Sequence, residues 1–325
     1  MLTMKLIRLL TAALFSLGLA SLPAADQPAA SAALKTAPDG SGTIQFQISG
    51  KTSLTFNFGP DVDLPHFFPV NSPSGKSITV QRTEPYPHHR SFWFADTVRL
   101  KGQRRASFYN GWYTRVNTNK PTGPFKDTIR VLPETFKVAP GPGGSQLATW
   151  KQVWEMDLGK TAVLDESREV RLVPLGRGEY FLDLKFTLTA AHGDVAFESD
   201  AVHYAWPFIR LNNDFNTNSG ALLTSSTGAK GQAETNLKPA EWMDFSKPEE
   251  GLAMFSHPSN PGPHSYLTRD YGCIGPRRVD AQSGKLFTLK QGESISTRCG
   301  VLVHLGDVQA GKVAERFRAY CDGKL

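Results

Sequence analysis

Cysteine is scarce in this chain, whose 325 residues include only Cys273, Cys299 and Cys321. An odd number excludes a fully paired disulfide framework within one chain, although one disulfide is compatible with an oxidising compartment. Paired Cys-x-x-Cys and His-Glu-x-x-His spacings are absent from the sequence, as are glycine-rich phosphate loops and dinucleotide fingerprints. No standard metal or nucleotide motif therefore identifies a function.

Long hydrophobic runs are confined to the N-terminus. Lys5 and Arg8 precede an apolar stretch at 9–20, and small residues follow at Ala24 and Ala25. This pattern is typical of a secretory signal peptide, and the run is shorter than the about 20 apolar residues that a membrane span needs. We predict a signal peptide over 1–24, a disordered leader rich in Ala, Pro and Ser over 25–40, and a single domain over 41–325. The predicted localisation is periplasmic or secreted, with an uncleaved anchor as the alternative.

Charge of one sign is not concentrated anywhere along the chain. The formal net charge is +6, from 36 Lys and Arg against 30 Asp and Glu. Because no block of like charge occurs, nucleic acid is not an expected partner. Beyond the signal peptide, no membrane partner is expected either.

Helix signals are few, and alternation of apolar with polar residues dominates. It recurs over 44–48, 54–58, 182–188 and 295–303, as in half-buried antiparallel strands. We predict an all-β fold, a large antiparallel β-sandwich with a short C-terminal helix over 310–321 that covers a sheet edge or face. The Pro/Gly cluster at 140–144 is interpreted as a hairpin loop rather than a linker between domains.

Polar residues gather in the segment Tyr86-Pro87-His88-His89-Arg90-Ser91-Phe92-Trp93-Phe94. Neighbouring side chains of a strand point to opposite faces, and an imidazole is costly to bury unpaired. A packing role therefore explains at most one of His88 and His89. The segment indicates a functional site without naming a reaction.

Three further segments place polar groups at predicted strand ends, where loops often carry sites. Residues 255–261 contain His257 and Asn260, and residues 268–272 contain Arg269, Asp270 and Tyr271. Residues 241–245 contain Trp242 and Asp244.

Segments 87–94, 255–261, 269–272 and 300–307 resemble a family of secreted bacterial proteins labelled the PmoA family, and the resemblance runs from about residue 64 to the end. The methane-oxygenase label does not transfer, because this chain has no spanning segment beyond its signal. The resemblance implies a sandwich similar to carbohydrate-handling proteins with the galactose mutarotase-like supersandwich.

The chain also departs from that family's pattern. Tyr86 stands where the family often has a histidine, and Tyr266-Leu267 stand where it often has Trp-His. The stretch that follows the aromatic strand, 96–99, also differs. Two candidate site histidines are therefore missing, which favours an altered substrate or a loss of activity.

The predicted function is acid–base chemistry on a carbohydrate or related hydroxylated compound: hydrolysis, elimination or epimerisation. Histidine can exchange a proton near neutral pH, so His88 and His89 lead, with His257 and Asp270 assisting. Substrate binding is assigned to Tyr86, Arg90, Trp93, Trp242, Asp244, Asn260, Arg269 and Tyr271. The prediction requires His88 or His89, His257 and Asp270 to converge in one cleft.

Two other uses of these residues are open. One is a glycan-binding module without catalysis, whose aromatic rings stack on sugars. The other is a metal-dependent enzyme in which His88 or His89, with His257 and Asp270, holds a divalent ion. No cofactor or metal ligand is assigned, because none of the spacings is diagnostic. Turn caps, ion pairs and core packing are the structural explanations of the same residues.

Overall fold

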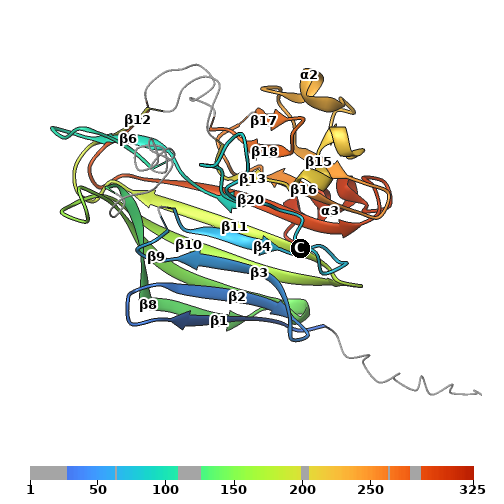
Figure 1. Cartoon of the computed structure of the whole chain (residues 1–325), viewed down its shortest axis with the longest axis horizontal. Helices are drawn as coiled ribbons and strands as arrows, with labels where there is room; N and C mark the ends of the chain where they lie inside the picture. The colour runs from blue at the N-terminus through green and yellow to red at the C-terminus, as the bar shows by residue number, and fades with distance from the viewer. Residues whose placement is uncertain (1–27, 63, 109–125, 199–204, 263, 279–286) are drawn as a thin grey trace, which may run out of the picture.

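The computed structural model describes residues 28–62, 64–108, 126–198, 205–262, 264–278 and 287–325 (Figure 1). The predicted signal peptide, 1–24, lies outside these ranges. Within them, no helix has the length and apolar character that a membrane crossing would require.

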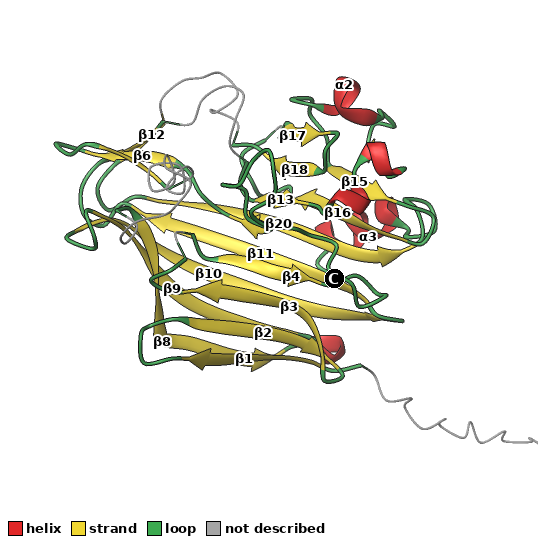
Figure 2. Cartoon of the chain, in the orientation of Figure 1, coloured by secondary structure: helices red, strands yellow, loops and turns green. Residues whose placement is uncertain are grey.

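Two eight-stranded sheets form the body of the molecule (Figures 1 and 2). The first sheet has the order β1 (Ala30–Thr36), β2 (Gly42–Ile48), β3 (Lys51–Phe58), β4 (His66–Val70), β5 (Phe92–Trp93), β13 (Phe208–Arg210), β18 (Cys273–Pro276), β17 (Tyr266–Arg269). The second has the order β14 (Leu222–Ser225), β15 (Trp242–Ser246), β16 (Glu250–Ser256), β20 (Ser294–Leu305), β11 (Glu179–Thr189), β10 (Thr161–Gly176), β9 (Gln146–Met156), β8 (Thr128–Pro140). Their strands pair antiparallel, so the predicted sandwich is confirmed.

The main core lies between these sheets. Phe56 of β3 contacts Trp150 of β9, with ring centroids 4.9 Å apart. The hydroxyl of Tyr180 on β11 donates to the carbonyl of Asn71 at 2.8 Å. Period-two alternation explains this arrangement, because Leu182 and Leu184 are buried on the same face of β11.

Smaller elements complete the fold. They are a four-stranded sheet in the order β19 (Phe287–Leu289), β12 (Val195–Phe197), β6 (Thr97–Leu100), β7 (Arg105–Ser107), the helices α2 (Gly231–Thr235) and α3 (Val313–Cys321), and the 3-10 turns η1 (Pro142–Gly144), η2 (Asn213–Phe215) and η3 (Thr217–Ser219). The predicted hairpin loop at 140–144 is confirmed, since it joins the paired strands β8 and β9.

Helix α3 covers the outer face of the second sheet, as the amphipathic pattern predicts. Val313, Phe317 and Tyr320 form a second hydrophobic cluster with sheet residues such as Phe181 and Phe255. Residues on β11 that alternate with Phe181, such as Leu182, belong to the main core instead.

The prediction of disorder over 25–40 was wrong for Ala30–Thr36. This segment is β1, which pairs in full register with β2 from Ala30↔Ile48 to Thr36↔Gly42. Its alternation of small and apolar side chains, with Ala30, Ala32 and Leu34 packed against the core, outweighs the Ala/Ser-rich composition.

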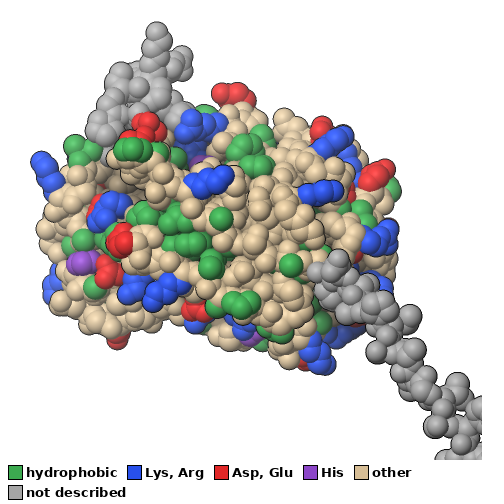
Figure 3. All heavy atoms as spheres, turned by 90° about the horizontal axis from the view of Figure 1, so that it is seen from below, with side chains coloured by type: hydrophobic (Ala, Val, Ile, Leu, Met, Phe, Trp, Pro, Cys, Tyr) green, Lys and Arg blue, Asp and Glu red, His purple; other side chains and the backbone are tan. Residues whose placement is uncertain are grey.

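Figure 3 shows the surface from below, where Lys and Arg are interspersed with Asp and Glu.

Candidate functional site

The two adjacent histidines lie in a tight turn and not on a strand. The N–H of Tyr86 donates to the carbonyl of Thr83 at 3.0 Å, and the N–H of His89 donates to that of Tyr86 at 2.9 Å. The turn brings the rings of His88 and His89 into edge-to-face contact, with centroids 4.4 Å apart. The expectation that they point to opposite faces was therefore wrong, because β5 begins only at Phe92.

Aromatic rings surround His89. Tyr86 stacks on it with centroids 5.0 Å apart, and Trp93, Phe208 and Tyr271 lie at 5.6, 5.7 and 6.4 Å. These rings come from the turn before β5, from β5, from β13 and from the turn between β17 and β18. Segments far apart in the chain thus meet at one place.

This cluster occupies the outer face of the first sheet. Phe92 of β5 points inward, because its ring contacts Phe67 of the main core at 5.1 Å. Trp93, the next residue, points the other way and contacts His89 and Phe208. Arg210 pairs with Cys273 across β13 and β18, which sets both side chains on the outer face as well.

Arg210 is one of the buried cations of the cluster. It is 1% exposed, and its guanidinium lies 4.7 Å from the centre of the Tyr271 ring. Its Nη2 donates weakly to Asn213 Oδ1 at 3.5 Å, but its Nε and Nη1 have no acceptor in the part of the chain that the structure describes. Gly272, at φ +92°, permits this packing, since a Cβ there would lie 3.3 Å from Arg210 Nη1.

Burial and positive neighbours keep His89 neutral. Desolvation is the larger cause and, together with His88, Arg210, Arg90 and Arg269, lowers the pKa of His89 to about 2. A neutral imidazole carries a lone pair that can accept a proton or a hydrogen bond. Its Nδ1 lies 3.8 Å from the Cys273 thiol.

The thiol and the phenol of the cluster are neutral too. Burial raises the pKa of Cys273 to about 12 and raises the pKa of Tyr271 above its ordinary value. Neither group therefore supplies negative charge to Arg210 near neutral pH.

Arg90 and Arg269 join the cluster as predicted neighbours of the histidines. Arg90 is fully buried, and its Nη1 donates to the carbonyl of Pro87 at 3.4 Å. Arg269 Nη1 donates to Asn236 Oδ1 at 2.7 Å. Seven of the residues singled out in the sequence thus come together, namely Tyr86, His88, His89, Arg90, Trp93, Arg269 and Tyr271.

Asp270 lies beside this cluster in the chain, but its carboxylate points elsewhere. Oδ1 accepts from the N–H of Gln232 at the start of α2, at 2.9 Å. The backbone N–H of Asp270 donates in return to Gln232 Oε1 at 3.0 Å. The side chain therefore fastens α2 to the β17–β18 turn, and this reciprocal pair competes with the predicted catalytic role.

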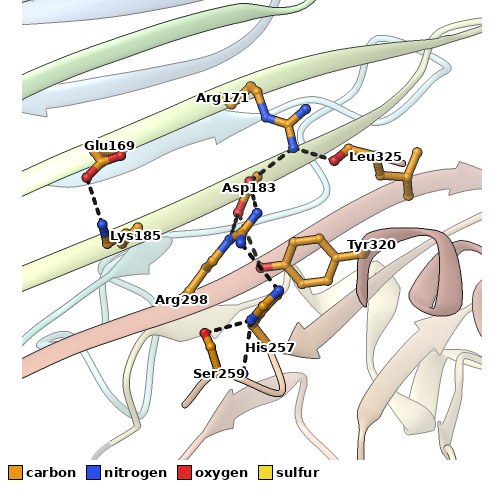
Figure 4. A network of polar contacts seen from close by, with 9 residues as sticks. All are labelled: Glu169, Arg171, Asp183, Lys185, His257, Ser259, Arg298, Tyr320 and Leu325. Atoms are coloured by element: carbon orange, nitrogen blue, oxygen red, sulfur yellow. Dashed lines mark hydrogen bonds and ion pairs between the residues drawn. The ribbon is translucent and has the colours of Figure 1, made fainter. Parts of the chain in front are cut away.

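His257 and Asn260 lie on the other side of the sandwich. His257 Nδ1 accepts from the N–H of Ser259 at 3.1 Å, its Nε2 lies 3.3 Å from Arg298 Nη1, and its ring contacts Tyr320 at 4.9 Å (Figure 4). Asn260 bonds the backbone of Arg298 on β20 through both amide atoms, at 2.7 and 2.8 Å. These contacts face α3, so His257 and Asn260 do not join the His88–His89 cluster.

Trp242 and Asp244 are also held away from it. Trp242 packs in the hydrophobic cluster beneath α3. Asp244 is fully buried and bonds His304 Nε2 at 2.8 Å and Ser246 Oγ at 2.5 Å. Both side chains, predicted to bind substrate, face the outer side of the second sheet and therefore do not reach the His88–His89 cluster.

Cavities do exist on that side. One of about 440 Å³ is lined by Arg171, Asp183, Lys185 and Arg298, and one of about 830 Å³ runs between His257 and α3. In the first, Arg298 binds Asp183 through two bonds of 2.8 and 2.9 Å, and Arg171 adds a third of 3.1 Å (Figure 4). Burial would raise the pKa of Asp183, but these bonds hold it below its usual value. The charges there are satisfied by one another.

A family model described as "Family of unknown function (DUF6807)" matches residues 43–318. The chain belongs to this family. The description of DUF6807 assigns no activity, so the PmoA label stays a prediction. A search of curated proteins finds no match.

Solved structures share the β-sandwich of this DUF6807 protein at a distance. A GH36 α-galactosidase, AgaA from Geobacillus stearothermophilus, has 8% identity and a TM-score of 0.42 over 86% of this chain and 42% of that one. A polysaccharide lyase has 13% identity and a TM-score of 0.36 over 91% and 34%. A glycoside hydrolase family 97 enzyme from Pseudoalteromonas sp. strain K8 has 9% and 0.35 over 85% and 34%. The chain spans less than half the length of each.

Metal donors do not cluster among the described residues of the DUF6807 chain, where no three His, Cys, Asp or Glu side chains lie close enough to hold an ion. The His257 and Asp270 donors of the metal alternative contact Arg298 and Gln232 instead.

Arg210, Phe208 and Cys273 are members of the cluster that the sequence did not single out. Arg210 belongs to a three-residue strand, too short for an alternation to be recognised. Cys273 was visible only as one of three unpaired cysteines. The Gly272 turn after Tyr271 is the one local signal, because it marks a close backbone approach.

Proposed function

We propose that this DUF6807 protein is exported and acts on a carbohydrate or related hydroxylated compound at the His88–His89 cluster. The observation that carries the proposal is the contact of two imidazoles with each other and with Tyr86, Trp93 and Tyr271. Tyr86 and Tyr271 are half-buried, so they offer a sugar ring apolar faces and hydroxyls together.

The chemistry follows from the protonation states. Neutral His89 accepts a proton from the substrate, with His88 in ring contact beside it. Tyr86 or Tyr271 donates a hydrogen bond, and in the reaction a proton, to a substrate oxygen. Hydrolysis, elimination and epimerisation each need such an acceptor and such a donor.

The test is turnover on a broad panel of glycans and glycosides, using exported protein whose mature N-terminus has been sequenced. We expect at least one substrate, and a loss of about 10²-fold or more in kcat/KM for His89→Asn. His192→Asn is the matched control, because His192 contacts Asp165 away from the cluster. Full activity in His89→Asn would refute the role of His89.

A binding module without catalysis is the second candidate. The burial of His89 among positive groups favours it, because this environment lowers the pKa of the imidazole to about 2 and makes it a weak base. Tight glycan binding without turnover, lost in Tyr271→Ala, would support this candidate over the enzyme.

A further inference from the structure

We propose that the ligand of the His88–His89 cluster carries a carboxylate, as in a uronic acid, and that Arg210 is the residue that binds it. This inference rests on the proposed function and names the class of substrate. Tyr271, which covers the guanidinium at 4.7 Å, rotates aside as the carboxylate enters, a side-chain change of the kind common at binding sites.

The first argument is the state of Arg210 itself. A guanidinium has five N–H donors and keeps its charge at all accessible pH values. Burying such a group is costly unless it is paired, yet the Nε and Nη1 of Arg210 have no acceptor among the described side chains and backbone. A carboxylate supplies two acceptor oxygens in the geometry that two adjacent guanidinium donors require.

The second argument is the charge of its contacts. Asn213 is uncharged, and the phenol of Tyr271 and the thiol of Cys273 are kept protonated by burial. The charged groups with the largest effects on His89 are all basic. The site is thus complementary to an anion.

The third argument comes from the same molecule. Arg168, also 1% exposed, is paired with Glu166 through bonds of 2.6 and 3.0 Å. At Arg168 the fold itself supplies the carboxylate that pairs a buried arginine. At Arg210, whose printed acceptor among the described residues is the amide of Asn213, the ligand supplies it.

The edge of the cluster is half-buried. Tyr86, Tyr271 and Arg269 keep part of their surface exposed, whereas His89 and Arg210 are buried. A sugar that stacks on the tyrosines can therefore direct a carboxylate inward beside His89. Because positive neighbours lower the pKa of His89, a bound anion raises it, and protonation of His89 strengthens anion binding by the same factor.

The experiment measures binding of oligouronides (galacturonate, glucuronate and alginate oligomers) and of their methyl esters, which have the same sugars without the charge. With wild-type protein we expect at least one acid to bind about 10-fold tighter than its ester, a difference of about 1.4 kcal/mol. Arg210→Met should reduce that ratio to near one, and Arg210→Lys should keep part of it. The His89 resonances should titrate at higher pH when the acid is bound.

Measuring the stability of the variant distinguishes the loss of the binding site from the loss of the fold. Arg210→Met removes an incompletely paired buried cation, so its melting temperature should equal or exceed that of wild type. If esters and neutral glycans bind or react as well as acids, the inference is wrong and the proposed function stands. If no sugar of either class binds or reacts, both are wrong.

Discussion

Arg168 and Arg210 are two buried arginines in opposite surroundings. Arg168 lies in the main core, with its guanidinium over Phe186 at 4.7 Å and its charge met by Glu166. Glu166 is itself completed by Trp154 Nε1 at 2.8 Å and Gln152 Nε2 at 2.6 Å. Arg210, on the outer face of the first sheet, stacks on one tyrosine and lacks acceptors on two nitrogens among the residues described.

This difference in pairing distinguishes a buried charge that stabilises the fold from one that can bind a ligand. A closed network of donors and acceptors makes a buried charge tolerable and fixes the packing around it. An arginine with unpaired donors does not fix the packing around it in this way. Proteins retain such groups where a ligand supplies the missing acceptor. Burial alone therefore does not distinguish Arg210 from Arg168, whereas the pairing of the guanidinium does.

The largest effect is expected from breaking the closed network. Arg168→Met leaves Glu166 buried without its cation, so we expect the free energy of unfolding to fall by about 3–5 kcal/mol. Urea denaturation of the purified variant measures it. Arg168→Met/Glu166→Gln should recover part of the loss, because a neutral amide can still bond Trp154 and Gln152. If Arg168→Met were as stable as Arg210→Met, the surroundings of Arg168 and Arg210 would not differ as described.

A smaller effect concerns the pH dependence of stability. His89 has a pKa of about 2 in the folded protein and an ordinary value near 6.5 when unfolded. The unfolded state therefore binds more protons between these values, and His89 lowers stability as the pH falls below about 6.5, by about 1.4 kcal/mol per pH unit. Unfolding measured at pH 6, 5 and 4 should show a shallower slope for His89→Asn. Identical slopes would mean that burial and the neighbouring positive groups do not hold His89 neutral.

The smallest effect is expected at His257. Its ring is only partly buried, and its polar partners are Ser259 and Arg298. His257→Ala should reduce the free energy of unfolding by less than about 1 kcal/mol and leave turnover unchanged. A loss of turnover comparable to that of His89→Asn would place the reaction on the α3 side and reverse the assignment of the two faces.

The sandwich and the C-terminal helix could be predicted because their signals are periodic and local. Leu182 and Leu184 define one face of β11 from spacing alone, and Val313, Phe317 and Tyr320 define one face of α3. Half of the site could be found in the same way, since Tyr86 to Trp93 is one polar and aromatic segment. The turn that brings the ring of His88 against His89 could not be predicted, because the alternation of side chains along a strand does not hold where the chain bends.

The other half of the site depends on which sheet each strand joins and on which face of that sheet its side chains lie. His257 and Tyr271 both follow strands in polar segments, and nothing local distinguishes them. Only the pairing of β16 with β20 and of β18 with β13 sends one to the α3 side and the other to Arg210. Such long-range register is set by the whole sheet and is not visible in a segment.

The strands that carry the candidate site are short. β5 has two residues, β13 three, and β17 and β18 four each, whereas β10 and β20 have sixteen and twelve. Few backbone bonds secure each short strand. The partners of β5 and β13 also lie far away in the chain, whereas β17 and β18 pair as a hairpin. We therefore expect this end to assemble last and to exchange its amide hydrogens first. The proposed reaction would thus take place where the molecule opens most readily. A destabilised variant would lose ligand binding before the long strands of the two large sheets unfold.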